Sequence, residues 1–93
     1  MNFDELRKTP GLSKSQIENA AEAVKDFRYV ERDFEFQVAR GTTPSNFQGL
    51  NSFVTTISVK YKPTGKKREY REENFSAWAV PFKRDLQMGY FKS

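Results

Sequence analysis

The sequence contains neither cysteine nor histidine. Without cysteine there is no disulfide framework and no thiolate metal ligand, which is typical of proteins of a reducing cytoplasm. Without histidine the chain lacks the side chain that most often acts as a base near neutral pH. These absences remove the usual nucleophile, the usual general base and most zinc ligand sets. We therefore expect a non-enzymatic protein with no catalytic residues, no cofactor and no metal site.

Long apolar runs are also absent. No stretch approaches the roughly 18 apolar residues of a membrane-spanning helix. The first eight residues are largely polar and lack the apolar region of a secretion signal. We expect a cytoplasmic protein with no membrane partner.

Aromatic residues are abundant: nine Phe, four Tyr and one Trp make up 15% of the 93 residues. Each can bury roughly 150–250 Å², so a few side chains suffice for a core. The length fits one domain, residues 1–93, without a linker. Asn2–Lys8 is predicted to form a short helical turn. The composition allows disorder only at the ends, residues 1–9 and 90–93.

A longer helix is predicted to begin at Ser13. Ser13 can cap the helix, with Gln16 as its reciprocal partner, and Leu12 and Ile17 occupy the positions of a hydrophobic staple. The apolar residues recur at helical spacing and predict an amphipathic helix of about four turns whose buried face is formed by Ile17, Ala20, Ala21 and Val24.

After this helix the apolar spacing changes to every second residue. Phe34, Phe36 and Val38 lie on one face of a first predicted strand, with Asp33, Glu35 and Gln37 on the other. A second strand follows with Phe53, Thr55, Ile57, Val59 and Tyr61 on its apolar face. Antiparallel pairing predicts Phe34 beside Val59, Phe36 beside Ile57, Asp33 beside Lys60 and Glu31 beside Lys62.

A third strand is predicted after a tight turn around Pro63 and Gly65. Pairing Lys62 with Lys67 places Tyr70 inside, next to Val59. The same register places Glu69 outside next to Lys60. Pairing Lys62 with Lys66 would instead turn Glu69 inward, so we favour the first register.

The last third of the chain leaves alternatives open. Proline is tolerated in the first turn of a helix but not in its interior, so a short helix is predicted from Pro81 to Gly89. Phe75–Val80 is then an extended segment, and whether it forms a fourth strand stays open. The sequence predicts an α+β fold in which an N-terminal amphipathic helix packs on a three- to four-stranded antiparallel sheet and a short C-terminal helix follows.

The clearest functional pattern is a cluster of cations around the predicted turn: Lys60, Lys62, Lys66, Lys67, Arg68 and Arg71. The net charge is +4, and residues 61–93 contain eight Lys/Arg against four Asp/Glu. Cations at a projecting hairpin tip can neutralise phosphates, and β-ribbons enter the major groove. Tyr61 or Tyr70 could stack on a base, although both suit the core. This pattern predicts a small accessory protein that binds DNA or RNA through a basic hairpin.

The alternative is a protein-interaction module without nucleic-acid binding. It would act as a homodimer, or as an inhibitor or adaptor of a larger partner, through the same hairpin or an open sheet edge. Three carboxylates, Glu31, Asp33 and Glu35, lie on one predicted strand face, but cross-strand pairing with lysines explains them better than a cation site.

Overall fold

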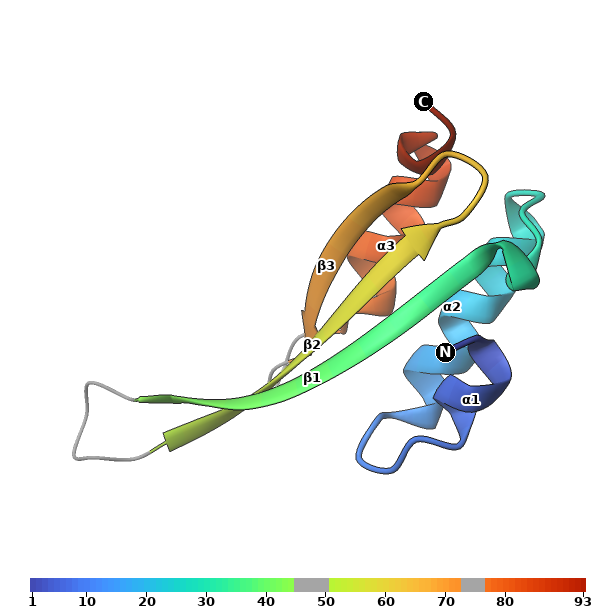
Figure 1. Cartoon of the computed structure of the whole chain (residues 1–93). Helices are drawn as coiled ribbons and strands as arrows, with labels where there is room; N and C mark the ends of the chain where they lie inside the picture. The colour runs from blue at the N-terminus through green and yellow to red at the C-terminus, as the bar shows by residue number, and fades with distance from the viewer. Residues whose placement is uncertain (45–50, 73–76) are drawn as a thin grey trace.

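The computed structural model describes residues 1–44, 51–72 and 77–93 (Figure 1). The elements in chain order are α1 (Phe3–Arg7), α2 (Lys14–Asp26), the 3-10 helix η1 (Glu31–Asp33), β1 (Phe34–Pro44), β2 (Asn51–Tyr61), β3 (Lys66–Glu72), α3 (Ala79–Gln87) and the 3-10 helix η2 (Tyr90–Lys92). The strands form one antiparallel sheet in the order β1-β2-β3. The predicted α+β class is confirmed, with three strands among the described residues.

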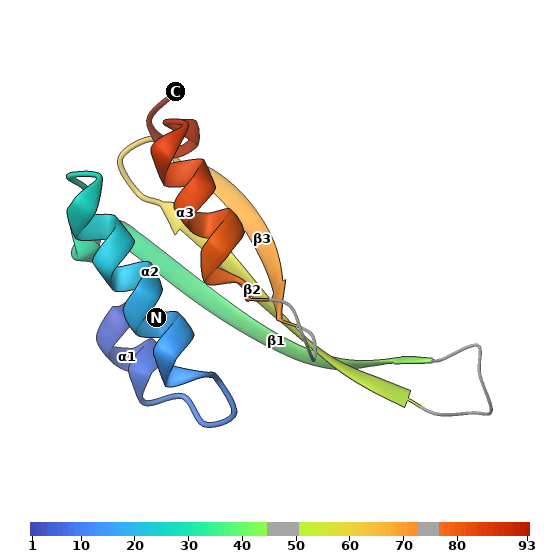
Figure 2. The ribbon, with the colours of Figure 1, turned by 180° about the vertical axis from the view of Figure 1, so that it is seen from behind.

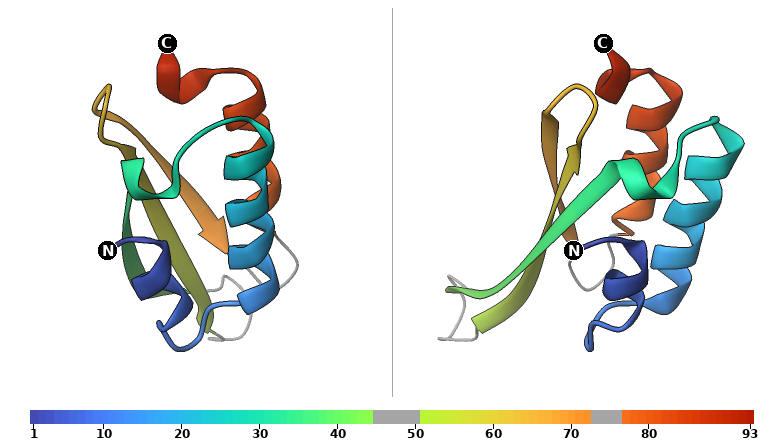
Figure 3. Two further views of the ribbon diagram at one scale, coloured as in Figure 1. Left: turned by 90° about the vertical axis from the view of Figure 1, so that its right-hand side faces the viewer. Right: turned by 45° about the vertical axis from the view of Figure 1, so that its right-hand side comes forward.

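The helices lie on one face of the sheet and leave the other face open (Figures 2 and 3). The predicted apolar face of α2 is buried, including Ile17 and Val24. Ser13 occupies the N-cap position of this helix as predicted, but the predicted side-chain bonds of the cap are wrong. The Ser13 side chain makes no cap hydrogen bond, and the Gln16 Oε1 accepts a hydrogen bond from the Ala79 N–H at 3.3 Å. Gln16 therefore links α2 to α3 instead of closing its own helix.

The core consists largely of aromatic rings gathered around Phe34. This side chain is fully buried, and its ring centroid lies between 5.1 and 6.5 Å from those of five other aromatic residues: Phe3, Tyr29, Tyr61, Phe82 and Phe91. These residues come from α1, the α2–η1 connection, β2, α3 and η2. Phe34, at the start of β1, thus packs against rings from five different segments of the fold.

The strand registers differ by two residues from the predicted ones. Phe34 pairs with Tyr61 and Phe36 with Val59. Across the second hairpin, Tyr61 pairs with Lys66, which leaves a four-residue loop in which Gly65 has a φ of 74° and its N–H donates to the Tyr61 carbonyl at 2.8 Å. The predicted inward and outward faces are nevertheless correct, because a shift of two residues preserves them.

The predicted pairs of Asp33 with Lys60 and of Glu31 with Lys62 are wrong. Glu31 and Asp33 belong to η1 and precede the sheet. Lys60 instead pairs with Glu35 on β1. Of the three carboxylates predicted on one face of the first strand, only Glu35 lies in the sheet, so the row of three does not exist.

The last helix begins two residues before Pro81, which lies in its first turn as proline requires. Ala79 and Val80 are helical, so the extended segment predicted at Phe75–Val80 is wrong for them, and residues 75–76 lie outside the described ranges. Gly89 ends this region with a φ of 73°, as predicted.

Both ends of the chain, where composition allowed disorder, form regular structure. In α1 the Asn2 side chain and the Glu5 side chain form a capping box, and Phe3 is buried. Met1 and Phe36 exchange two backbone hydrogen bonds of 2.7 and 2.8 Å, so the first residue extends the sheet beyond β1. Within the described ranges, no helix has the length and hydropathy needed to cross a bilayer.

Candidate functional site

The six predicted site residues lie on the β2–β3 hairpin but do not gather on one surface. Successive side chains of a strand point to opposite faces. Lys60, Lys67 and Arg71 therefore lie on the open outer face of the sheet, while Lys66 and Arg68 share the inner face with the buried Tyr70. Lys62 is exposed at the start of the turn. The cations that the sequence places around the turn are thus divided between the two faces of the sheet.

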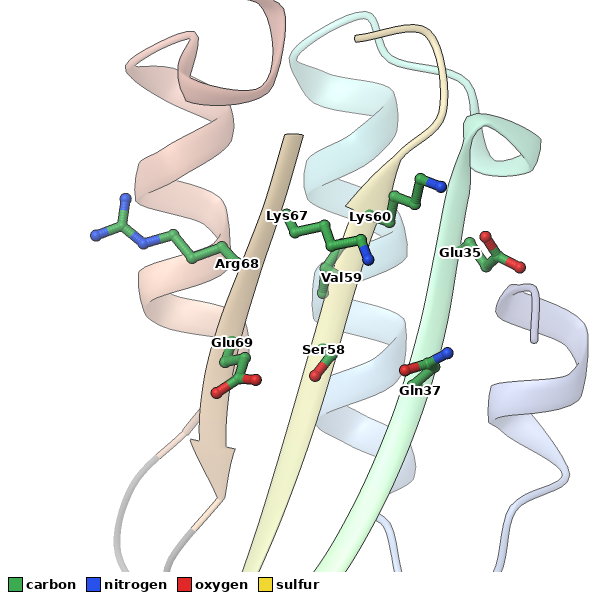
Figure 4. Close-up of a pocket in the computed structure, with 8 residues that line it drawn as sticks. All are labelled: Glu35, Gln37, Ser58, Val59, Lys60, Lys67, Arg68 and Glu69. Atoms are coloured by element: carbon green, nitrogen blue, oxygen red, sulfur yellow. The ribbon is translucent and has the colours of Figure 1, made fainter. Parts of the chain in front are cut away.

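On the outer face, Lys60 and Lys67 are direct cross-strand partners. In Figure 4 the Lys67 side chain reaches over β2 toward Lys60, whereas Arg68 extends in the opposite direction. A shallow hollow of about 470 Å³ lies around the two lysines and is also lined by Gln37 and Ser58. This arrangement places two ammonium groups beside neutral hydrogen-bonding groups that can also contact an anion.

Two carboxylates border the same hollow. Glu35 is the partner of Lys60 on β1, and Glu69 is the partner of Ser58 on β3 (Figure 4). Neither forms an ion pair within 4 Å of a cation among the described residues. The outer face is therefore of mixed charge, with its cations concentrated toward the turn.

The inner-face cations already have partners within the fold. The Lys66 ammonium lies 5.5 Å and the Arg68 guanidinium 4.7 Å from the centroid of the Tyr90 ring. Arg68 also donates to Asp85 at 3.3 Å. The Tyr90 hydroxyl donates to the Lys67 carbonyl at 2.8 Å. These contacts direct Lys66 and Arg68 toward η2 and α3, away from the lysine pair on the outer face.

Asp85 is a buried carboxylate, with 8% of its surface exposed. Its Oδ2 accepts a hydrogen bond of 2.6 Å from the Tyr70 hydroxyl, and its Oδ1 accepts the bond from Arg68. Burial and the hydrogen bond to Asp85 raise the pKa of Tyr70 well above its usual value. Because both carboxylate oxygens are engaged, we interpret Asp85 as a structural group that ties α3 to β3.

Ionisation of the buried tyrosines should destabilise the protein at high pH. Burial also raises the pKa of Tyr29 and Tyr61. The unfolded chain releases these protons near pH 10, whereas the folded chain retains them. We therefore expect the free energy of unfolding to fall as the pH rises above about 10. Urea unfolding between pH 8 and 11 measures this, and Tyr70→Phe should give a shallower decline; an unchanged slope would contradict the assignment.

The structure excludes base stacking by the two tyrosines of the hairpin. Tyr61 is 6% and Tyr70 is 4% exposed, and both rings pack in the core. Sequence reasoning missed Asp85 and Tyr90, which contact the inner-face cations from the far end of the chain. A signal was available, because alternation along β3 places Lys66 and Arg68 on the same face as Tyr70.

The remaining acidic residues do not form a metal centre within residues 1–44, 51–72 and 77–93, where no group of three or more potential ligands occurs. Glu31 accepts a hydrogen bond of 3.0 Å from Arg7, which also binds Asp4 at 2.8 Å and Glu18 at 2.7 Å. These ion pairs raise the pKa of Arg7. They connect α1, α2 and η1, which is a structural role.

Comparison of the chain with protein-family models, with curated proteins and with solved structures gave no match.

Proposed function

We propose that the protein is a small non-enzymatic accessory protein that binds nucleic acid through phosphate contacts at the turn end of the β2–β3 hairpin. The observation that carries the proposal is the Lys60–Lys67 cross-strand pair on the open face. Like charges directly opposite each other destabilise a sheet, and a bound phosphate removes that cost. Lys62, at the start of the turn, adds a third cation, and Arg71 lies further along β3.

The proposed mode of binding is recognition of the backbone. Over residues 55–61 and 66–71, the outer-face side chains are Thr56, Ser58, Lys60, Lys67, Glu69 and Arg71, which offer no ring on which a base could stack. Lysine contacts to phosphate carry no sequence information. These features favour a duplex over a single strand and predict weak discrimination between sequences.

Two double variants of equal charge test the proposal. Replacing Lys60 and Lys67 with alanine removes the outer pair, whereas replacing Lys66 and Arg68 removes the inner cations of the same hairpin. Each phosphate contact contributes about −0.9 to the slope of log K against log salt. We expect the first variant to reduce the magnitude of that slope by roughly 2 and to weaken binding at low salt, while the second leaves the slope nearly unchanged.

Fluorescence anisotropy with a labelled 20-base-pair duplex, between about 20 and 200 mM salt, measures both quantities. Circular dichroism should show that both variants are folded. Equal losses in the two variants would indicate dependence on net charge alone and would contradict the assigned site. Failure of the unmodified protein to bind at the lowest salt would overturn the function itself.

A second candidate function is that of a protein-interaction module. The observation that favours it is that β3 is an edge strand of the sheet that the described residues form, which is independent of the lysine pair. The chemistry of this edge indicates what kind of partner it suits.

A further inference from the structure

The backbone groups on the outer edge of β3 can be located from two separate contacts. The Tyr90 hydroxyl donates a hydrogen bond to the Lys67 carbonyl, so the backbone N–H and C=O of Lys67 point away from β2. In an antiparallel strand the N–H and C=O of one residue point to the same side and alternate along the chain. Glu69 and Arg71 must then also point outward.

The hydrogen bonds at the opposite edge of the sheet indicate the same orientation for the backbone of Glu69. Phe36 exchanges backbone hydrogen bonds with Met1, so the N–H and C=O of Phe36 point away from β2. Val59, its partner, therefore bonds to Arg68 on β3, which leaves the neighbouring Glu69 turned outward. Among the described residues, no backbone or side-chain group bonds the outward N–H and C=O of Glu69 or Arg71. The edge is a template for one more strand.

A groove of about 490 Å³ runs along this edge between β3 and α3. Glu69 and Arg71 line its sheet side, and Pro81, Arg84 and Met88 line its helix side. Met88 is 74% exposed, the highest value among the large apolar side chains that the structure describes. A strand bonded to the edge would cover this methionine and the proline with every second side chain.

Charge determines the other face of such a strand. Its outward side chains would lie next to Lys67, Glu69 and Arg71, two cations and one anion. The Asp85 carboxylate adds no free negative charge to the groove, because it accepts hydrogen bonds from Arg68 and Tyr70. Arg84 adds a positive charge. The segment that fits therefore alternates acidic residues on one face with apolar residues on the other.

We infer that the β3 edge binds an extended segment of a partner protein in which acidic and apolar residues alternate. A second copy of this chain fits less well, since pairing through its own β3 would bring its own α3 to the same edge. The inference does not depend on phosphate binding, because the added strand bonds to the backbone of Glu69 and Arg71 and does not need the pairing of Lys60 with Lys67.

The test uses a blocked seven-residue peptide of alternating glutamate and valine, and the full chain labelled with ¹⁵N. In the free protein the Glu69 and Arg71 amides should exchange rapidly with deuterium, while the Arg68 and Tyr70 amides, bonded to β2, exchange slowly. Added peptide should protect the two edge amides and shift their resonances. The same peptide with lysine in place of glutamate should bind about tenfold more weakly or worse, since several charge pairs are reversed.

A proline substitution separates edge pairing from simple charge attraction. Glu69→Pro removes an outward N–H that the sheet does not use, so the fold should persist, and peptide affinity should fall about tenfold. Glu69→Ala is the matched control and should bind the acidic peptide at least as well as the unmodified protein. Duplex binding should be equal in Glu69→Pro and Glu69→Ala, because both lose the carboxylate that borders the lysine hollow. A difference between the two variants in peptide binding alone then distinguishes this site from the lysine pair.

Three results would overturn the inference. One is the absence of any peptide effect at millimolar concentration. Another is equal binding by the proline and alanine variants, which would place the peptide elsewhere. The third is a dimer in sedimentation experiments that Glu69→Pro abolishes, which would identify a second copy as the occupant.

Discussion

Replacing Phe34 with alanine should destabilise the protein by about 3–5 kcal/mol, the largest effect that we expect from a single substitution. The side chain is fully buried and its ring lies against five other aromatic rings. Its removal leaves a cavity that rigid rings cannot collapse to fill. A domain of this size is stable by roughly 5–14 kcal/mol, so much of the total would be lost.

Urea unfolding followed by circular dichroism measures this loss. Val38→Ala is the matched control, since Val38 lies on the same face of β1 but only partly buried at the margin of the core. We expect a loss of about 1 kcal/mol there. Similar losses of stability at the two positions would contradict the central role of Phe34 in the ring cluster.

The two-residue errors in strand register show what a sequence pattern can determine. Burial of Phe34 and Phe36 requires that one face of β1 point inward, and this fixes whether a register is odd or even. A shift by two residues leaves every side chain on its face, so burial cannot distinguish the predicted register from the observed one. The choice depends on the Gly65 turn and on the packing of Tyr61 against Phe34, at 5.1 Å between ring centroids.

The same alternation decides how much of the candidate site was predictable. It places Lys60 and Lys67 outside and Arg68 inside in the favoured register and in the observed one. The division of the cluster between the two faces therefore follows from the sequence. The partners of Arg68 do not. Asp85 is 17 residues away on a helix whose rotation depends on tertiary packing, and no local pattern identifies it.

Replacing Asp85 with alanine should cost about 2–3 kcal/mol, the second large effect. The substitution leaves the Tyr70 hydroxyl, which binds Asp85 at 2.6 Å, without an acceptor in the core. It also releases Arg68, but this side chain is about half exposed, so its ion pair contributes little. Arg68→Ala should therefore cost less than about 1 kcal/mol. Chemical denaturation at pH 7 measures both.

A double-mutant cycle with Tyr70→Phe tests whether the hydroxyl is the cause. When the hydroxyl is absent, loss of the Asp85 carboxylate no longer strands a buried donor, so the double variant should be at least as stable as Asp85→Ala alone. Asp85→Asn keeps an acceptor for Tyr70 without the charge and should fall between the original protein and Asp85→Ala. If the two single losses simply add, the carboxylate contributes through packing or through Arg68, and the link between α3 and β3 does not depend on this hydrogen bond.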